Sequence, residues 1–314
     1  MEGNAFTPGR PVEIVNALSV DVEEHFQVSA FEGAIRRSDW STLPSRVESN
    51  THRLLDLFDV AGVKATFFVL GWIGERKPAL VRQISERGHE VASHGYGHRL
   101  VYQQTPEDFK AETIASKRLL EDAAGVKVKG YRAASFSITR RSLWALDILC
   151  EIGFEYDSSI FPVVHDRYGI PGAPRRPFSV RPAGGGEIIE FPPSTVKLGR
   201  LVVPAAGGGY LRVYPLWATR MAIRRLNGPD RSPAMLYVHP WEVDPGQPRI
   251  KAPLLTSLRH YTGLRSTEKK LLHLMRRFRF APVAQAVAAH GQLEAVDLSL
   301  LSEPQGDGRS GYLA

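Results

Sequence analysis

The sequence predicts an α/β protein built on a mostly parallel sheet. From about residue 14, short apolar runs alternate with segments whose apolar residues recur at helical spacing, and this alternation is typical of parallel sheets. The chain is 43% hydrophobic and 23% charged, as globular proteins are. Its 314 residues favour one main domain with an extension, because barrel-like α/β folds commonly fill this length as one unit.

The first half of the chain is the most regular part. Strands are expected where β-branched and aromatic residues cluster, and helices where apolar residues repeat every three or four positions. Thr105 is a predicted N-cap and Gly125 a predicted helix end. In chain order we expect strand 14–20, helix 46–60, strand 64–70, helix 79–87, strand 89–92, helix 106–124, strand 129–133, helix 140–152 and strand 154–157.

After residue 157 the alternation weakens. Residues 166–186 are rich in Pro, Gly and Arg, which indicates a long functional or mobile loop. The remaining strand candidates are 187–191, 210–213 and 234–238, and the pattern beyond Pro253 is helical. We therefore expect one α/β domain over 10–250, a helical extension packed on it over 251–300, and a polar tail over 301–314.

The charge pattern and the first residues of the sequence indicate which partners and which location to expect. The formal net charge is +7, but the basic residues are scattered, which favours a solvated basic surface, and no nucleic-acid-binding motif accompanies them. Helix 267–277 is basic and amphipathic, which fits a membrane-binding helix or, more commonly, an ordinary surface helix. No window reaches ~18 consecutive apolar residues and residues 1–10 lack a leader pattern. We expect a cytoplasmic protein without a transmembrane segment.

Asp21 and Glu23 follow the first expected strand. Alternation along a strand points both carboxylates the same way, where they repel each other unless a cation or proton lies between them. A helix N-cap with a solvated acidic loop explains them equally, because Glu24 follows directly.

His94 and His98 lie after the third expected strand, in the segment SHGYGH. The glycines at positions 95 and 97 make a helix improbable and favour a turn that folds the second imidazole back beside the first. Two histidines with one carboxylate are the usual ligands of an open catalytic zinc site, and a second carboxylate is then free to act as a base. A histidine pair at this spacing alone is often a surface accident.

His239 comes between a strand and Pro240. An imidazole with its usual pKa near ~6.5 can donate a proton near neutral pH, which suits a general acid. A satisfied core histidine is the competing interpretation. The neighbouring Trp241 suits the wall of a pocket, stacking on a sugar, or packing alone.

These segments together resemble the polysaccharide deacetylase family, also called the NodB-homology or carbohydrate esterase four family. The segments VDVEEHFQVSAFE, ATFFVLGW, GHEVASHGYGH, YRAASFSI, YDSSIFP and LYVHPWEVDP are most similar to the branch associated with exosortase (PEP-CTERM) exopolysaccharide loci. The resemblance spans about residues 15–244. It implies a distorted, incomplete (β/α) barrel and metal-dependent removal of N-acetyl groups from amino sugars.

The resemblance also implies roles for single residues. Asp21 matches the catalytic base, Arg132 the arginine that orients this base, and His239 the general acid. The metal ligands would be His94, His98 and Glu23, with zinc as the expected ion. Glu23 departs from the adjacent aspartates of many members, and alanine follows Arg132 where many members have proline.

The resemblance leaves the surrounding residues more open. Asp157 is a candidate to support the acid or to cap a turn, and backbone N–H groups of residues 157–161 are candidates to stabilise an oxyanion. Trp241, Tyr96 and Phe161 are the candidates for substrate contacts.

The expected substrate is an amino-sugar polysaccharide or oligosaccharide, of the exopolysaccharide type, with weak association with membrane-bound polysaccharide machinery as a further partner. Two alternatives stay open: hydrolysis of a small cyclic amide or formamide, and a non-catalytic carbohydrate-binding relative. Against the latter, no candidate catalytic position carries an inert residue.

Overall fold

The computed structural model describes residues 14–165, 167–182 and 184–302. The expectations about a leader in residues 1–10 and about the tail from residue 303 onward fall outside these ranges. Of the helices in the described part of the chain, none combines the length and the apolarity needed to cross a bilayer.

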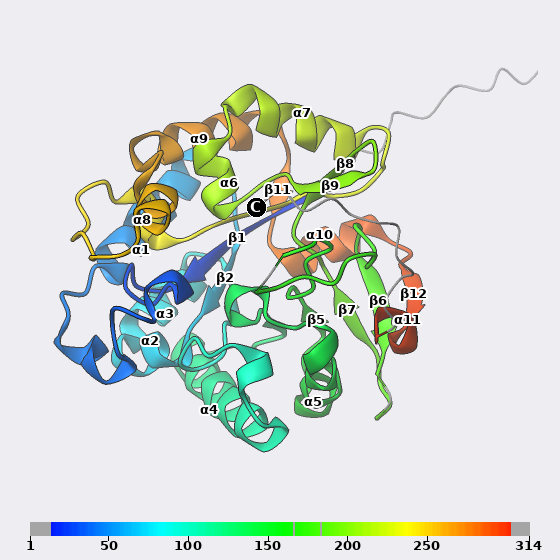
Figure 1. Cartoon of the computed structure of the whole chain (residues 1–314), viewed down its shortest axis with the longest axis horizontal. Coiled ribbons are helices and arrows are strands. Elements are labelled where there is room, and N and C mark those ends of the chain that lie inside the picture. The colour runs from blue at the N-terminus through cyan, green and yellow to red at the C-terminus, as the bar shows by residue number, and fades with distance from the viewer. Residues whose placement is uncertain (1–13, 166, 183, 303–314) are drawn as a thin grey trace, which may run out of the picture.

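One mixed sheet of ten strands organises the molecule, and it is mostly parallel as predicted (Figure 1). The strand order is β10-β1-β2-β3-β4-β5-β7-β6-β12, with β11 also paired to β1, and only the β6–β7 pair is antiparallel. The strands of this sheet are β1 Asn16–Val22, β2 Thr66–Val69, β3 Glu90–Ser93, β4 Gly130–Tyr131, β5 Tyr156–Asp157, β6 Phe178–Arg181, β7 Ile188–Glu190, β10 Met235–Val238, β11 Phe280–Ala281 and β12 Glu294–Asp297. A separate hairpin is formed by β8 Thr195–Leu198 and β9 Leu201–Pro204.

The helices cover this sheet and follow the predicted order. They are α1 Val47–Ala61, α2 Gly71–Arg76, α3 Pro78–Glu86, α4 Pro106–Ala124, α5 Trp144–Ile152, α6 Gly208–Val213, α7 Leu216–Asn227, α8 Leu254–Tyr261, α9 Thr267–Arg277, α10 Val283–His290 and α11 Leu298–Ser302. The predicted cap of α4 is present, because Thr105 Oγ1 accepts a hydrogen bond from Asp108 N at 3.1 Å, and Gly125 ends the helix in the left-handed conformation.

The prediction of a strand over 210–213 is wrong, because these residues form the end of α6. Gly207 and Gly208 adopt φ angles of 104° and 50° and turn the chain close against the Tyr237 ring, where a Cβ at either position would collide. The turn points Arg212 inward instead of along a sheet edge.

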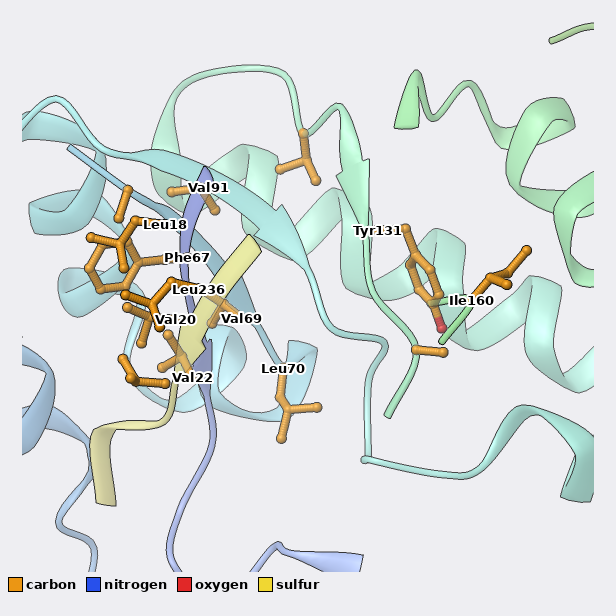
Figure 2. Packing of buried hydrophobic residues seen from close by; sticks show 14 of the residues in the cluster. Leu18, Val20, Val22, Phe67, Val69, Leu70, Val91, Tyr131, Ile160 and Leu236 are labelled. Carbon is orange, nitrogen blue, oxygen red and sulfur yellow. The ribbon is translucent and has the colours of Figure 1, made fainter. Parts of the chain in front are cut away.

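Alternation along the parallel strands separates a hydrophobic face from a polar one. Leu18, Val20 and Val22 of β1 pack with Phe67 and Leu236 in the main core (Figure 2). The intervening residues Ser19 and Asp21 share the other face, and both are buried. The fold thus directs the Asp21 carboxylate into the interior of the molecule near the carboxyl end of β1.

The segment after residue 250 is mainly helical and also completes the sheet. β11 pairs with the start of β1, and β12 forms the edge beside β6. The C-terminal segment is therefore built into the same structure as the strands that carry the site.

Candidate metal centre and active site

Three strand ends converge at one edge of the sheet, as the sequence pattern predicts. β1 is parallel to both β10 and β2, and β2 is parallel to β3, so their carboxyl ends lie together. Glu23 follows β1 directly, His94 follows β3, and His239 follows β10. Residues far apart in the sequence thereby enclose one polar site.

Glu23, His94 and His98 form a cluster with metal-binding geometry. Each offers one ligand atom, all three atoms lie within 4.8 Å of one another, and all three residues are buried. The loop between the histidines turns sharply, since Gly95 has φ 73° and His98 itself has φ 50°. The turn predicted from the glycines is present, and its backbone brings the His98 imidazole to the His94 imidazole.

Unpartnered polar atoms at the centre of this cluster show that it suits a cation. Glu23 Oε2 lies 2.8 Å from His98 Nε2, yet neither Glu23 Oε2 nor His98 Nδ1 has a hydrogen-bond partner, although both are buried. Burying such atoms without partners is costly. Two imidazoles and one carboxylate are also the donor set of open zinc sites. The residues present therefore fit a divalent metal ion.

His94 is held in the orientation that a metal ligand needs. Its Nδ1 lies 2.8 Å from the Arg132 carbonyl oxygen, so Nδ1–H donates and Nε2 keeps its lone pair for the cluster. Burial lowers the pKa of His94 to about 4, which keeps the ring neutral.

Trp241 supports Glu23 from the other side. Its indole Nε1–H donates to Glu23 Oε1 at 3.1 Å, and its ring stacks between His239 and His260 at centroid distances of 4.9 and 4.2 Å. Burial opposes ionisation of Glu23, but the neighbouring charges of His98 and His239 lower its pKa to about 2. Trp241 is buried, so the structure gives it a supporting contact where a sugar platform was one expectation.

Arg132 fixes Asp21, as the resemblance implies. Arg132 Nη1 donates to Asp21 Oδ1 at 2.5 Å and to Ser19 Oγ at 2.9 Å, and Nη2 donates to Ser158 Oγ at 2.9 Å. The guanidinium lies over the Phe68 ring, 4.0 Å from its centroid. Both charges are buried, and the paired hydrogen bonds offset their desolvation.

His239 lies at the rim, facing both carboxylates. Its Nε2 is 3.8 Å from Asp21 Oδ2 and 3.7 Å from Glu23 Oε1. Its side chain is 17% exposed, against 4% or less for Asp21, Glu23 and His98, so it is the group a ligand reaches first. Burial opposes protonation, but Glu23 and then Glu242 raise the pKa of His239 to about 9.

Glu242 and Arg212 form a second buried ion pair behind His239. Glu242 Oε2 lies 3.4 Å from His239 Nδ1 and accepts from the His239 backbone N–H at 3.1 Å, while Oε1 accepts from Arg212 Nε at 2.7 Å. Arg212 Nη1 also donates to the carbonyls of Arg259, His260 and Thr262 at the end of α8. The C-terminal segment is thus connected to the histidine at the rim.

Asp157 lies deeper than its predicted role requires. It is fully buried, and Ser159 Oγ donates to its Oδ1 at 2.5 Å. Burial raises the pKa of Asp157, and burial together with Asp157 raises the pKa of the neighbouring Glu190. The described contacts of His239 include Glu242 but not Asp157. Asp157 instead binds Ser159 Oγ, and this hydroxyl oxygen accepts a hydrogen bond from the Ala133 N–H. Asp157 therefore supports the loop that carries Arg132 and Ala133.

The candidates for substrate contacts and for the oxyanion have contacts of their own within the fold. Tyr96 donates through its hydroxyl to Glu75 on α2, and Phe161 is packed among Phe136 and Tyr168. In the 157–161 loop, the N–H groups of residues 158 and 160 already donate to the Tyr131 carbonyl and to Glu190 Oε1. These contacts engage the Tyr96 hydroxyl and the N–H groups of residues 158 and 160, and the roles of Tyr96, Phe161 and the 157–161 loop toward a substrate stay predictions.

Several supporting residues were not predicted from sequence. Glu242 was detectable, because it stands three positions after His239 just past a strand end. Ser19, alternating with Asp21 on β1, gave a weaker signal of the same kind. Arg212, Ser158 and Glu190 carried no local signal.

The chain is similar to known proteins over parts of its length. The family model described as polysaccharide deacetylase matches residues 39–155, and a domain of unknown function, DUF3473, matches residues 158–288. A peptidoglycan deacetylase of Helicobacter pylori is 31% identical over 152 residues, covering 47% of this chain and 50% of that protein. A peptidoglycan-N-acetylglucosamine deacetylase of Bacillus cereus is 31% identical over 98 residues, covering 31% of this chain and 36% of the relative. The chain thus spans half or less of these curated relatives, and over that part it is similar to polysaccharide deacetylases.

Solved structures confirm the fold class. A putative polysaccharide deacetylase from Mycobacterium smegmatis has a TM-score of 0.58 at 19% identity and covers 99% of both chains. Puue allantoinase has a TM-score of 0.59 at 15% identity, covering 90% of this chain and 91% of that one. The fold is a mixed α/β fold with a mostly parallel central sheet.

Proposed function

We propose that this protein is a metal-dependent hydrolase that removes N-acetyl groups from the amino sugars of a polysaccharide or oligosaccharide. The observation that carries the proposal is the placement of Asp21 and His239 beside the buried cluster of Glu23, His94 and His98. The family match and the curated deacetylase relatives support the same reaction class.

Glu23, His94 and His98 would hold the ion, and this donor set favours zinc. When bound, a divalent ion supplies Lewis acidity, which polarises an amide carbonyl and lowers the pKa of water toward ~7.

Asp21 is the base in this proposal. Arg132 binds Asp21 Oδ1 and leaves Asp21 Oδ2 directed toward His239 and the cluster. That oxygen would take the proton of the attacking water. Because Arg132 binds the other oxygen, the carboxylate cannot rotate away from the substrate.

His239 is the acid. Glu242 beside Nδ1 favours a proton on that nitrogen, which leaves Nε2 directed at the site. Nε2–H would be given to the departing sugar amine, so that a glucosamine unit and acetate are the products. The pair therefore divides the work: one side chain accepts the proton of water and the other protonates the leaving group.

The finer assignments belong to this proposal as well. The motif resemblance favours an exopolysaccharide-type substrate and the exosortase-associated branch. A cytoplasmic location and weak association with membrane-bound polysaccharide machinery are part of the proposal.

Acetate release from N-acetylglucosamine oligomers tests the proposal. We expect release by metal-repleted protein, loss of release on chelation, and loss in Asp21→Asn with the metal still bound. Asp39→Asn, which alters an exposed aspartate, is the matched control and should keep full activity. Release by Asp21→Asn at the wild-type rate would remove the base assignment.

A substrate panel separates the alternatives. Metal-dependent hydrolysis of a cyclic amide or formamide, with no acetate from any amino sugar, would replace the deacetylase proposal. Oligosaccharide binding without turnover at full metal occupancy would identify a carbohydrate-binding relative.

A further inference from the structure

Helix α7 presents a face that combines arginine with large exposed apolar side chains. Trp217, Arg220, Met221 and Arg224 stand at helical i, i+3, i+4 and i+7 spacing and so share one face. Trp217 is 63% and Met221 59% exposed, and Val213, at the end of the preceding helix α6, is 56% exposed. Single exposed apolar residues need no explanation, but a group of them among cations marks an interaction surface.

Helix α9 adds a basic face beside α7 (Figure 1). Lys269, His273, Arg276 and Arg277 are all exposed and follow i, i+4, i+7 and i+8 spacing. Together with Arg220 they line a surface hollow of about 460 Å³ between the two helices. The cations of both helices thus face one common space.

We call this surface the α7–α9 face, and among the described residues that line its hollow none is acidic. Residues 216–227 contain no Asp or Glu. The acidic residues adjoining the two helices are engaged elsewhere, since Glu268 pairs with Arg53 and Asp230 lies 3.5 Å from Arg175. Arg220 Nε is buried and has no hydrogen-bond partner.

We propose that the α7–α9 face docks on a membrane surface rich in anionic phospholipid. The phosphate headgroups would bind Arg220, Lys269, Arg276 and Arg277. The exposed Trp217 and Met221 side chains of α7 would enter the apolar boundary below the headgroups. A soluble polyanion needs only the cations, whereas an exposed indole and thioether among them match an interface that is wet on one side and apolar on the other.

Vesicle cosedimentation of the full chain tests the proposal independently of any hydrolase activity. Binding is expected to vesicles of phosphatidylglycerol mixed with phosphatidylcholine, to weaken with salt, and to be absent with phosphatidylcholine alone. The double substitution Arg276→Gln with Arg277→Gln should lower the partition coefficient by about tenfold or more. Trp217→Ala with Met221→Ala should lower it as well.

A matched variant controls for net charge. Arg82→Gln with Arg118→Gln removes the same charge from exposed positions on α3 and α4 and should bind like the wild type. Failure of the wild-type protein to bind anionic vesicles would overturn the proposal. An equal loss of binding in Arg276→Gln with Arg277→Gln and in the control Arg82→Gln with Arg118→Gln would overturn it as well. Equal binding to soluble polyphosphate and to vesicles, insensitive to Trp217→Ala with Met221→Ala, would also overturn it and identify a polyanion site. Circular dichroism confirms that each variant is folded.

Discussion

Arg132 binds Asp21 through a 2.5 Å hydrogen bond in which neither side chain is accessible to solvent. The same guanidinium reaches Ser19 on β1 and Ser158 just after β5. One side chain therefore links β1 to the segment after β5, and it binds the Asp21 oxygen that the proposed base does not need for catalysis.

Arg132→Met should destabilise the protein severely. It leaves the Asp21 carboxylate buried without its partner, and breaking a buried ion pair in this way costs about 3–5 kcal/mol. Urea unfolding of the variant measures the loss. Arg82→Met, at an exposed position, should change stability by less than about 0.5 kcal/mol. Equal effects at the two positions would show that the Arg132–Asp21 pair contributes no stability.

Trp241→Phe should weaken metal binding while the fold is kept. The phenyl ring can still stack between His239 and His260, but it cannot donate to Glu23 Oε1. Loss of such a supporting hydrogen bond typically costs about 10–100-fold in metal affinity. Zinc competition against a fluorescent chelator gives the ratio, with Trp217→Phe on the exposed face of α7 as the control. An unchanged affinity would contradict the role of Glu23 as a ligand supported by Trp241.

Arg212→Gln and Glu242→Gln should be strongly non-additive. Each single change strands a buried charge, because Arg212 and Glu242 are paired at 2.7 Å with little solvent contact, whereas the double change removes both. We expect the double variant to be less destabilised than the sum of the singles by about 1–3 kcal/mol. Unfolding free energies of the wild type, the two single variants and the double variant complete this double-mutant cycle. A coupling free energy of zero would mean that Arg212 and Glu242 are not energetically linked.

Acidification should destabilise the fold through His89. Its Nδ1 accepts a hydrogen bond from the Ala65 N–H at 3.1 Å, and burial lowers its pKa from 6.5 to about 4. Because the folded-state pKa lies below the unfolded one, the stability that this histidine contributes is complete above pH 6.5. It is lost as the pH falls from 6.5 toward 4, by at most about 3 kcal/mol.

His89→Asn isolates this contribution. Asparagine can still accept from Ala65 but does not titrate, so the variant should lose less stability than wild type over that pH interval. His273→Asn, at an exposed position on α9, should follow the wild-type curve. Parallel curves for all three proteins would exclude His89 as the titrating group.

The elements of the site that could be predicted are those with a local signature. Asp21, His94 and His239 each lie at or just after the carboxyl end of a β-strand. Parallel pairing of these strands is enough to bring the three residues to one edge of the sheet. The glycine-bearing turn between His94 and His98 needed no more than backbone preferences.

The remaining elements depend on packing between distant segments. The sequence around Arg212 alternates as a strand does, but two preceding glycines and the bulk of Tyr237 turn it into α6, and only then does its guanidinium reach Glu242. Trp241 was predicted near the site, but its hydrogen bond to Glu23 depends on how η6 (Pro240–Val243) folds back over β1. Such contacts are set by three-dimensional fit, which one sequence does not encode locally.

The pairing of β1 has a consequence for how the chain folds during synthesis. β1 precedes the other described strands in the sequence, yet its neighbour on one side is β10, which begins at residue 235. The chain must therefore be translated as far as β10 before β1 can acquire a partner on that side. Until then this edge of β1 stays unpaired, and pairing over such a long sequence distance slows folding and favours aggregation. The ribosome-bound intermediate is thus the state in which we expect this protein to depend most on chaperones.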